Sequence, residues 1–410
     1  MSSSSNRPPL EGVTVVEIGV FMAGPFATLQ LADLGARVIK VETPGSGDQT
    51  RTVGPFIEGE SSAFMRLNRN KESVEIDLKS AEGAARLRAL LAQADVLVEN
   101  LRPGALARMG FGYDDLKDEF PGLVYASASG WGQDGPLAAN AGLDIMAQAR
   151  SGLMSITGFP DGEPVKLGVP VADLSCALYV TIAVLAALRE RDRSGLGQAI
   201  DVSLFESAVS LAVWEAGSYY ATGQVAKPQG SAHQASAPYQ AVATSDGYVT
   251  IGANTQRNWA RFCVALGLDA LVEDERFLTP TQRMENRGAL IALIEDDFRN
   301  RTVAEVVALL DEAGVPAAPI NTFPQVFTDE HLHARDFFWS APHPKAGAVE
   351  QLGSPMRLSR TPVVRGAAGP VLGADTDTVL GGLGASATDG DGNGGASAGT
   401  TGAGSAEGDR

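Results

Sequence analysis

The chain has 410 residues, of which 44% are hydrophobic and 20% are charged, and its formal net charge is −17. This composition is typical of a globular enzyme with room for two domains. The acidic balance disfavours binding to nucleic acid or to an anionic membrane, because phosphate groups are bound by clustered Lys and Arg. No unbroken run of about 18 apolar residues predicts a membrane span, and the polar first nine residues do not resemble a secretory signal, so we expect a cytoplasmic protein.

Cysteine and histidine usage predicts no metal site and no disulfide framework. Cys176 and Cys263 lie in apolar helical patterns, so we expect buried thiols. His331 and His333 have a spacing that could bind a metal, but no accompanying Cys or carboxylate pattern completes a ligand set.

Strands and helices alternate in the first third of the chain. The first β-α-β unit comprises a strand over Val13–Ile18, a turn from Gly19 to Pro25, a helix over Phe26–Leu34 and a strand over Arg37–Glu42. A helix over Ala81–Ala94 and strands over Val96–Val98 and Leu123–Ala128 follow. This alternation predicts a parallel sheet with right-handed crossovers.

The pattern changes after residue 170. Leu174–Glu190 is apolar nearly all round and predicts a buried helix, and Asp201–Tyr220 predicts a second long helix. The polar segment Gly223–Ala237 resembles a hinge. Beyond it we expect a hairpin over Tyr239–Ala243 and Tyr248–Gly252, helices over Gln256–Leu266, Arg287–Phe298 and Val303–Ala313, and a strand over Val315–Ile320.

These elements indicate an α/β protein with a Rossmann-like large domain, built from both ends of the chain, and a smaller central α+β domain. The expected ranges are 8–222 for the first part of the large domain, 228–328 for the small domain and 329–383 for the return to the large domain. The segment 384–410 is rich in Gly, Ala, Ser and Asp, so we expect it to be disordered.

One carboxylate stands in an unusual place. Asp173 lies between an extended apolar run and a long apolar helix, with no Lys or Arg within six residues on either side. Asp is a favoured helix N-cap, which is the structural interpretation. The functional interpretation is a carboxylate nucleophile that a strand-to-helix turn aims at an electrophile. The position by itself leaves both interpretations open.

The turn between Gly19 and Pro25 leads into a helix N-terminus, where backbone N–H groups favour phosphate. Glu42 ends the second strand, where a dinucleotide-binding fold places its ribose-binding acid. The glycines are spaced as GxxxxG and not as GxGxxG, so an NAD-dependent enzyme stays open only as an alternative to a plain tight connection. No GxSxG nucleophile motif occurs, which leaves Asp173 as the best nucleophile candidate.

Several motifs, in order, resemble the class III CoA-transferases, the family of formyl-CoA:oxalate and carnitine CoA-transferases. The matching segments are residues 10–18, 24–25, 31–42, Leu67-Asn-Arg-Asn-Lys71, 95–100, Arg102-Pro-Gly104, Gly130-Trp-Gly-Gln-Asp-Gly-Pro136 and Thr157-Gly158. The resemblance covers about residues 8–380. It implies that Asp173 is the nucleophile, which forms an acyl anhydride and then an aspartyl-CoA thioester.

The resemblance also implies CoA contacts and a substrate loop. The implied CoA contacts are Met22, Ala23, Ile76, Asp77, Leu78, Lys79, Asn100, Leu101, Arg102, Arg108, Ala141, Gly142 and Asp144. Lys79, Arg102 and Arg108 are candidate phosphate partners, although each is equally readily explained as a solvated surface charge. The implied substrate residues are Gly230 and His233, with a loop-stabilising role for His233 as the alternative.

Two departures bear on the substrate. Formyl-CoA transferase has Gln where this chain has Met22 and Arg where it has Thr43, which puts oxalate in doubt as the acceptor. Its glycine-run loop is replaced by Gly230-Ser-Ala-His233, a variant similar to relatives that use succinyl-CoA and dicarboxylic acids.

The related α-methylacyl-CoA racemases use a His at the position of Leu143, and Leu cannot exchange a proton, so transfer is favoured over racemisation. A non-catalytic acyl-CoA-binding paralogue is a third possibility. The resemblance implies an interlocked homodimer that uses an acyl-CoA and a carboxylic acid as substrates and has no permanently bound cofactor.

Overall fold

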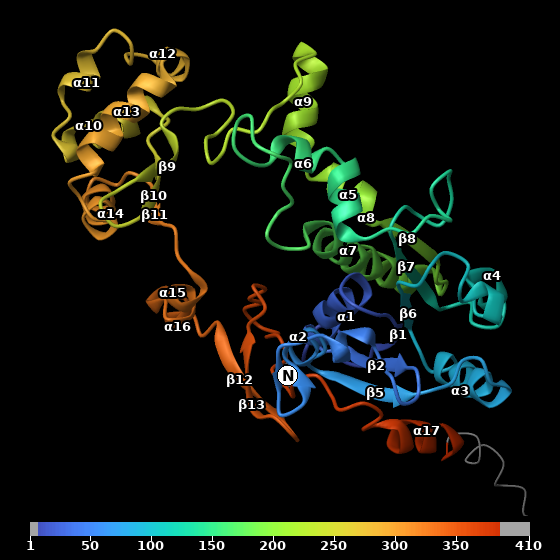
Figure 1. Ribbon diagram of the computed structural model, residues 1–410. Helices are drawn as coiled ribbons and strands as arrows, with labels where there is room; N and C mark the ends of the chain where they lie inside the picture. Colours follow the sequence, from blue (N-terminus) through green and yellow to red (C-terminus); the bar gives the residue numbers. More distant parts are fainter. Residues whose placement is uncertain (1–6, 386–410) are drawn as a thin grey trace, which may run out of the picture.

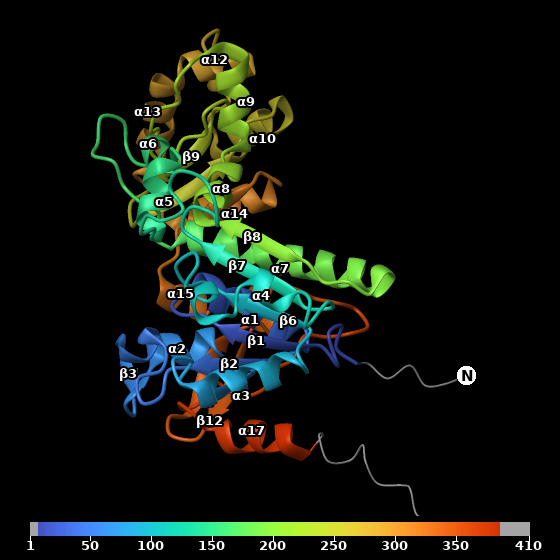
Figure 2. The same ribbon diagram turned by 90° about the vertical axis from the view of Figure 1, so that its right-hand side faces the viewer.

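The computed structural model describes residues 7–385, and a parallel six-stranded sheet organises its larger part (Figure 1). In sheet order the strands are β5 (Lys71–Glu75), β2 (Arg37–Glu42), β1 (Thr14–Ile18), β6 (Val96–Glu99), β7 (Val124–Ser129) and β8 (Ala199–Ser203). Figure 2 shows the strands succeeding one another from β8 to β2. The order reverses between β1 and β6, and open α/β sheets bind ligands at the carboxyl ends of the strands at such a reversal.

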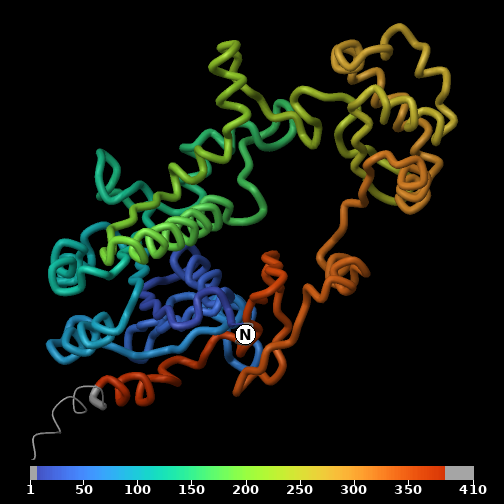
Figure 3. The backbone as a smooth tube through the Cα atoms, turned by 180° about the vertical axis from the view of Figure 1, so that it is seen from behind, coloured from blue at the N-terminus to red at the C-terminus, as the bar shows by residue number. Residues whose placement is uncertain are grey.

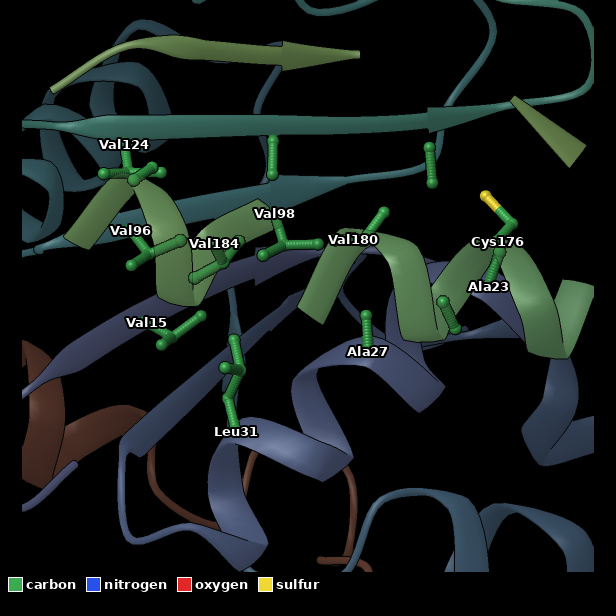
Figure 4. Close-up of a cluster of buried hydrophobic side chains, with 14 of the residues drawn as sticks. Val15, Ala23, Ala27, Leu31, Val96, Val98, Val124, Cys176, Val180 and Val184 are labelled. Carbon is green, nitrogen blue, oxygen red and sulfur yellow. The ribbon is translucent and has the colours of Figure 1, made fainter. Parts of the chain in front are cut away.

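Helices on both faces of the sheet bury its side chains. On one face lie α1 (Ala23–Asp33) and α7 (Val171–Ser194), and on the other lie α3 (Ala81–Leu91) and α17 (Thr376–Ala385). Successive side chains of β1 point to opposite faces of the sheet. Val15 lies in the cluster with α1 and α7 (Figure 4), and Val16 lies in the cluster with α3. Strands buried on both faces account for the apolar runs in the sequence.

Helix α7 begins earlier than predicted and is not buried all round. Its N-cap is Pro170, so Asp173 is the third residue of the helix and the N-cap interpretation of this carboxylate is wrong. Leu178 and Ile182 are exposed, whereas Val180 and Val184 are buried against the sheet. By length and composition α7 could cross a membrane, with a mean hydropathy of 2.1, but half of that apolar window is buried inside the protein.

The predicted helix over Asp201–Tyr220 is wrong, because this segment forms three elements. They are β8 (Ala199–Ser203), α8 (Leu204–Ser210) and α9 (Val213–Thr222). Ser203 ends the strand and caps α8, since its hydroxyl accepts a hydrogen bond from the backbone N–H of Glu206.

A second core lies away from the sheet. It surrounds the antiparallel strands β9 (Tyr239–Ala243), β10 (Tyr248–Gly252) and β11 (Ala317–Pro319). Its helices are α10 (Gln256–Leu266), α11 (Ala270–Glu273), α12 (Pro280–Glu285), α13 (Arg287–Phe298) and α14 (Val303–Glu312). Two separate segments join this unit to the rest of the chain (Figure 3). The predicted hairpin and three predicted helices here are confirmed, the last helix ending one residue earlier.

After the second core the chain returns to the large sheet. Helices α15 (Phe323–Phe327) and α16 (Glu330–Ala334) lead to a hairpin of β12 (Phe338–His343) and β13 (Gly347–Leu352). The backbone of Asp375 then hydrogen-bonds to Ser73 in edge strand β5, and α17 follows. The predicted disordered tail is wrong for residues 384 and 385, which end helix α17, and residues 386–410 lie outside the described part of the chain.

Short elements complete the connections between these strands and helices. They are η1 (Gln49–Thr52), β3 (Phe56–Ile57), β4 (Glu60–Ser61), α2 (Ser62–Leu67), η2 (Ala107–Met109), α4 (Tyr113–Leu116), α5 (Asp144–Arg150) and α6 (Leu153–Ile156).

Candidate active site

The turn that follows β1 is held from the neighbouring strand β6. The side-chain amide of Asn100 accepts a hydrogen bond from the Val20 N–H at 2.8 Å and donates one to the Val20 carbonyl at 2.8 Å. The next residue, Phe21, has a φ of 56°, and its N–H donates to Asp48 Oδ1 at 3.2 Å. Asn100, a predicted CoA contact, therefore fixes the backbone of the turn at the sheet's point of reversal.

A buried cluster of charges lies beneath this turn. Lys40 Nζ contacts Glu17 Oε1 at 2.6 Å, Asp48 Oδ2 at 2.9 Å and the Gly19 carbonyl at 2.8 Å. Lys71 Nζ contacts Glu17 Oε2 at 2.8 Å and the carbonyl of Pro25, in the first turn of α1, at 2.8 Å. Burial alone would raise the pKa of Glu17, but the two lysines outweigh burial and lower that pKa to about 2. Because the four charges balance, the cluster holds the start of the turn and the first turn of α1 without a net buried charge.

A cavity of about 240 Å³ opens beside the turn at the carboxyl ends of β1, β2 and β5. Its lining residues are Ile18, Gly19, Val20, Val41, Glu42, Thr43, Gly47, Asp48, Ile76, Asp77, Leu78, Lys79, Leu101 and Met109. Five of the predicted CoA contacts are among them: Ile76, Asp77, Leu78, Lys79 and Leu101. The structure therefore brings these five together, although they come from two different segments of the chain.

The other predicted CoA contacts fall outside the cavity lining. Met22 is the N-cap of α1 and Ala23 is its first residue, while Ala141, Gly142 and Asp144 belong to the segment that leads into α5. Arg102 and Arg108 are exposed on the loop after β6. Neither arginine, nor Lys79 in the cavity wall, forms a salt bridge among residues 7–385, so all three cations can meet a phosphate.

Glu42 does not present a free carboxylate to the cavity. Oε1 accepts from Arg51 Nη2 at 2.7 Å and from Ser73 Oγ at 2.6 Å, and Oε2 accepts from Arg51 Nε at 2.7 Å and from the Asp48 N–H at 2.9 Å. With both oxygens engaged in this way, Glu42 is not placed as the ribose-binding acid of a dinucleotide site.

Asp173 lies at the same edge of the sheet as the turn. Helix α7 connects β7 to β8 and runs back across the sheet, so its first turn lies near the carboxyl ends of the strands. Cys176, one turn into α7, shares a buried cluster with Ala23 at the start of α1 (Figure 4). The topology thus places the nucleophile candidate and the turn after β1 on one edge.

The carboxylate of Asp173 has no hydrogen-bond or salt-bridge partner among residues 7–385. Outside its own helix, Asp173 makes one hydrogen bond in the described chain, which its backbone N–H donates to Asp144 Oδ1 at 3.4 Å. Burial, together with the negative charge of Asp144, raises the pKa of Asp173 to about 7. A carboxylate with a raised pKa is more basic and poorly solvated, and both properties favour nucleophilic attack.

The segment that carries Asp144 packs against the Gly130-Trp-Gly motif. The indole N–H of Trp131 donates to the Ala141 carbonyl at 3.2 Å. A Cβ atom at Gly142 would lie 2.7 Å from the Gly130 Cα and 2.9 Å from Trp131 Nε1, so a glycine is required there. These contacts give Ala141 and Gly142, two of the predicted CoA contacts, a structural role in placing Asp144.

The two predicted substrate residues lie near the second core. His233 stacks on Tyr239 with ring centroids 5.0 Å apart, and its Nδ1 accepts from the Ala235 N–H at 3.1 Å. Gly230 lines a separate cavity of about 420 Å³ and its N–H donates to the Gly158 carbonyl at 2.8 Å. The contacts of His233 support the loop-stabilising role that the sequence left open.

Sequence reasoning missed the charge cluster and the loop from Thr43 to Asp48. The available signal was the presence of Glu17 and Lys40, each flanked by apolar residues inside a strand, whereas Lys71 begins the more polar strand β5. Charges at such positions must be paired. Which charge pairs with which depends on strand order, and the sequence does not supply that order.

Both cysteines are buried and free, as predicted. Within residues 7–385, no group of three or more His, Cys, Asp or Glu side chains has the arrangement of a metal site.

Comparison with known proteins identifies the class. The model of CoA-transferase family III matches residues 10–376. The chain belongs to this family and is a CoA-transferase, which confirms the resemblance noted in the sequence.

Its relatives agree in sequence and in fold. The chain is 39% identical over 380 residues to succinyl-CoA:glutarate CoA-transferase of Mus musculus, covering 92% of this chain and 87% of that protein. It is 37% identical to succinate–glutarate CoA-transferase of Agrobacterium fabrum, covering 93% and 97% respectively. A crystal structure of a CAIB/BAIF family protein from Brucella suis superposes with a TM-score of 0.84 at 39% identity, covering 92% of this chain and 100% of that chain.

Proposed function

We propose that this enzyme transfers CoA from succinyl-CoA to a free dicarboxylic acid through a covalent intermediate on Asp173. The observation that carries the proposal is the carboxylate of Asp173, which is largely buried, has no cation beside it in the described chain, and stands at the ligand-binding edge of the sheet. The names of relatives that are 37% and 39% identical, which specify succinate or succinyl-CoA and glutarate, support this pair of substrates.

In the first half of the reaction, an oxygen of Asp173 attacks the thioester carbonyl of succinyl-CoA. The C–S bond breaks, which leaves a mixed aspartyl–succinyl anhydride and CoA thiolate. The thiolate then attacks the aspartyl carbonyl, so that succinate leaves with an oxygen from Asp173 and an aspartyl-CoA thioester remains. Because the thiolate stays bound, its return is intramolecular and correspondingly fast.

In the second half, a carboxylate oxygen of the acceptor attacks the aspartyl thioester and expels CoA thiolate. The thiolate attacks the acyl carbonyl of the new anhydride, which releases the acceptor as its CoA ester. Asp173 is regenerated carrying one oxygen from the acceptor. Every step exchanges one acyl bond for another, so the atoms balance without a redox partner.

Other residues bind the substrates in this proposal. The cavity beside the turn after β1 holds part of CoA, with Lys79, Arg102 and Arg108 as phosphate partners. Met22, Ala23, Ala141 and Gly142 are the further CoA contacts that the family resemblance implies. The loop with Gly230 and His233 helps to select the acid.

We also propose that the enzyme is a homodimer, with the parallel sheet and the helices packed on it, α17 among them, as one domain and the second core as another. Helix α9 has no buried residue, and Val213, Trp214 and Tyr220 are 76%, 64% and 86% exposed. Large apolar side chains exposed together are typical of an interface.

The test follows an oxygen label. The enzyme is incubated with succinyl-CoA and ¹⁸O-labelled glutarate, the CoA esters are measured by mass spectrometry, and the peptide that contains Asp173 is analysed. We expect glutaryl-CoA, ¹⁸O in Asp173 and then ¹⁸O in succinate. A panel of mono- and dicarboxylic acids in place of glutarate defines the range of acceptors.

The Asp173→Asn variant should lose at least about 1,000-fold in turnover, as is typical when a covalent nucleophile is removed. Asp296→Asn, a change on an exposed helix surface, serves as the matched control and should retain full activity. Label in succinate with none in Asp173 would show direct attack of the acid on succinyl-CoA and would refute the covalent role. Exchange of the acyl α-proton without any acid acceptor would instead indicate racemase chemistry.

A further inference from the structure

Another helix supplies the cap for the N-terminus of α7. Pro170, the N-cap, offers no side-chain hydrogen bond to the first turn. Instead Asp144 Oδ1, in α5, accepts from the Ala172 N–H at 2.9 Å and from the Asp173 N–H at 3.4 Å. A carboxylate that accepts the free N–H groups of a first turn fixes the position of that turn.

The other oxygen of Asp144 is also held. Oδ2 accepts from Gln148 Nε2 at 2.6 Å, and Gln148 is completely buried. Gln148 Oε1 in turn accepts from the Leu167 N–H at 3.0 Å. A continuous chain of hydrogen bonds therefore runs from the segment before α7, through α5, to the backbone of the nucleophile.

We propose that Asp144 is a positioning residue for Asp173: it sets the direction of the nucleophile by capping the first turn of α7 and places a second negative charge beside it. This inference rests on the proposed function of Asp173. Both oxygens of Asp144 accept hydrogen bonds from groups of this chain, which is the arrangement of a carboxylate that orients its neighbours.

The negative charge of Asp144 favours the acylation of Asp173. Two carboxylates close together disfavour having both ionised, and acylation of Asp173 removes one of the two charges. Asp144 thereby destabilises the free nucleophile relative to the anhydride and the thioester. The same repulsion makes Asp173 more basic.

The titratable and charged side chains on the elements packed against α7 include Arg150 in α5, Asp201 in β8, Glu206 in α8 and Asp33 in α1, and Cys176 lies in α7 itself. The pKa of the Cys176 thiol is raised to about 12 by burial, so this group stays neutral at working pH. Asp33 is paired with Arg69 at 2.6 Å.

Two variants separate the charge of Asp144 from its hydrogen bonds. Asp144→Asn removes the charge but keeps an oxygen that can accept from the backbone of α7. Combining Asp144→Asn with Gln148→Glu places a carboxylate at position 148, where it can accept from the new side-chain amide at position 144 and from the Leu167 N–H. The double variant therefore restores a negative charge to the hydrogen-bond chain at a greater distance from Asp173. Asp296→Asn is again the remote control.

Two readouts are measured for each protein. The first is the pH profile of kcat/KM for succinyl-CoA and glutarate, whose acid limb we expect near pH 7 in the wild type. The second is the titration of the Asp173 carboxyl carbon by ¹³C NMR, assigned by difference from Asp173→Asn. In Asp144→Asn we expect kcat to fall about 10- to 100-fold through lost alignment, KM for the CoA ester to stay within about 2-fold, and both titrations to move to lower pH. In the double variant kcat should recover in part, while the titrations stay low.

An unchanged kcat and an unchanged titration in Asp144→Asn would overturn the inference. A raised KM with an unchanged kcat would also overturn it, because Asp144 would then be a CoA contact. If the wild type transfers no CoA to any acid, the proposed function fails, and the NMR titration still decides whether Asp144 acts on Asp173.

Discussion

Asp173 shows how a single residue can be placed for chemistry at the expense of stability. Burial and the neighbouring Asp144 raise its pKa from 3.8 to about 7. A raised carboxyl pKa means that the folded protein binds a proton more tightly than the unfolded chain does. Between about pH 4 and pH 7 the unfolded chain releases this proton first, so the contribution of Asp173 to stability falls as pH rises through this window.

The Asp173→Asn variant should therefore be more stable than the wild type above about pH 7. We expect its free energy of unfolding to be about 1–3 kcal/mol higher at about pH 8 and nearly equal to that of the wild type at about pH 4. Urea denaturation at the two pH values measures the difference. A variant that is equally stable or less stable at the higher pH would show that the ionised carboxylate is not strained in the folded protein.

Asp173 could be selected from the sequence because its isolation from cations is a local property. The link to Asp144 could not be predicted, since the two residues are 29 positions apart and meet only after α5 packs against α7. The contact of Asn100 with the turn at Val20, 80 residues before it in the chain, could not be predicted for the same reason. A side chain that acts by binding the backbone of a distant segment produces no recognisable pattern in the sequence.

At the scale of elements, the alternation of strands and helices predicted the parallel sheet, but two elements gave misleading patterns. Strand β5 carries Lys71, Glu72 and Glu75, so it lacks the apolar run of its neighbours, and its lysine is buried because the ion cluster neutralises it. In 201–220 the hydrophobic pattern continues across the break near Ala212, so it predicts one helix where the chain forms a strand and two helices.

The close packing of Gly142 on Gly130 and Trp131 leads to a prediction for the element that carries Asp144. In Gly142→Ala the new methyl group would meet backbone at 2.7 Å and must displace the start of α5. We expect a loss of about 1–3 kcal/mol in unfolding free energy and a fall of at least about 10-fold in kcat.

Denaturation and steady-state kinetics measure the two effects of Gly142→Ala. Gly288→Ala, at a helical glycine with no atom within 4 Å of the added methyl group, is the matched control and should retain activity and gain slightly in stability. An active, fully stable Gly142→Ala protein would show that the segment can shift without moving the nucleophile.

For the whole molecule, the second core stands apart from the sheet on two connections, and α9 has no buried residue within the described chain (Figure 3). We expect the wild type to be a dimer in solution and Val213→Glu combined with Tyr220→Glu to shift it toward the monomer, because charges would enter an apolar interface. Light scattering coupled to gel filtration measures the mass.

Val264→Glu, at a side chain 65% exposed on α10, is the control for this experiment and should leave the mass unchanged. A wild-type monomer would contradict the proposed dimer, and a double variant that remains dimeric would place the interface on another surface. The dimer interface is the feature least predictable from the sequence, because a helix face that packs inside one chain and a helix face that packs against a second chain carry the same kinds of apolar residue.

The return of the chain to β5 has a consequence for biosynthesis. The N–H groups of Ser73 and Glu75 donate to the side chains of Asp375 and Thr376, more than 300 residues later. During synthesis on the ribosome, these N–H groups of edge strand β5 therefore remain unpaired until nearly the whole polypeptide has emerged. The nascent enzyme is open to mispairing with other chains throughout that interval, and truncation before residue 375 would make the vulnerability permanent.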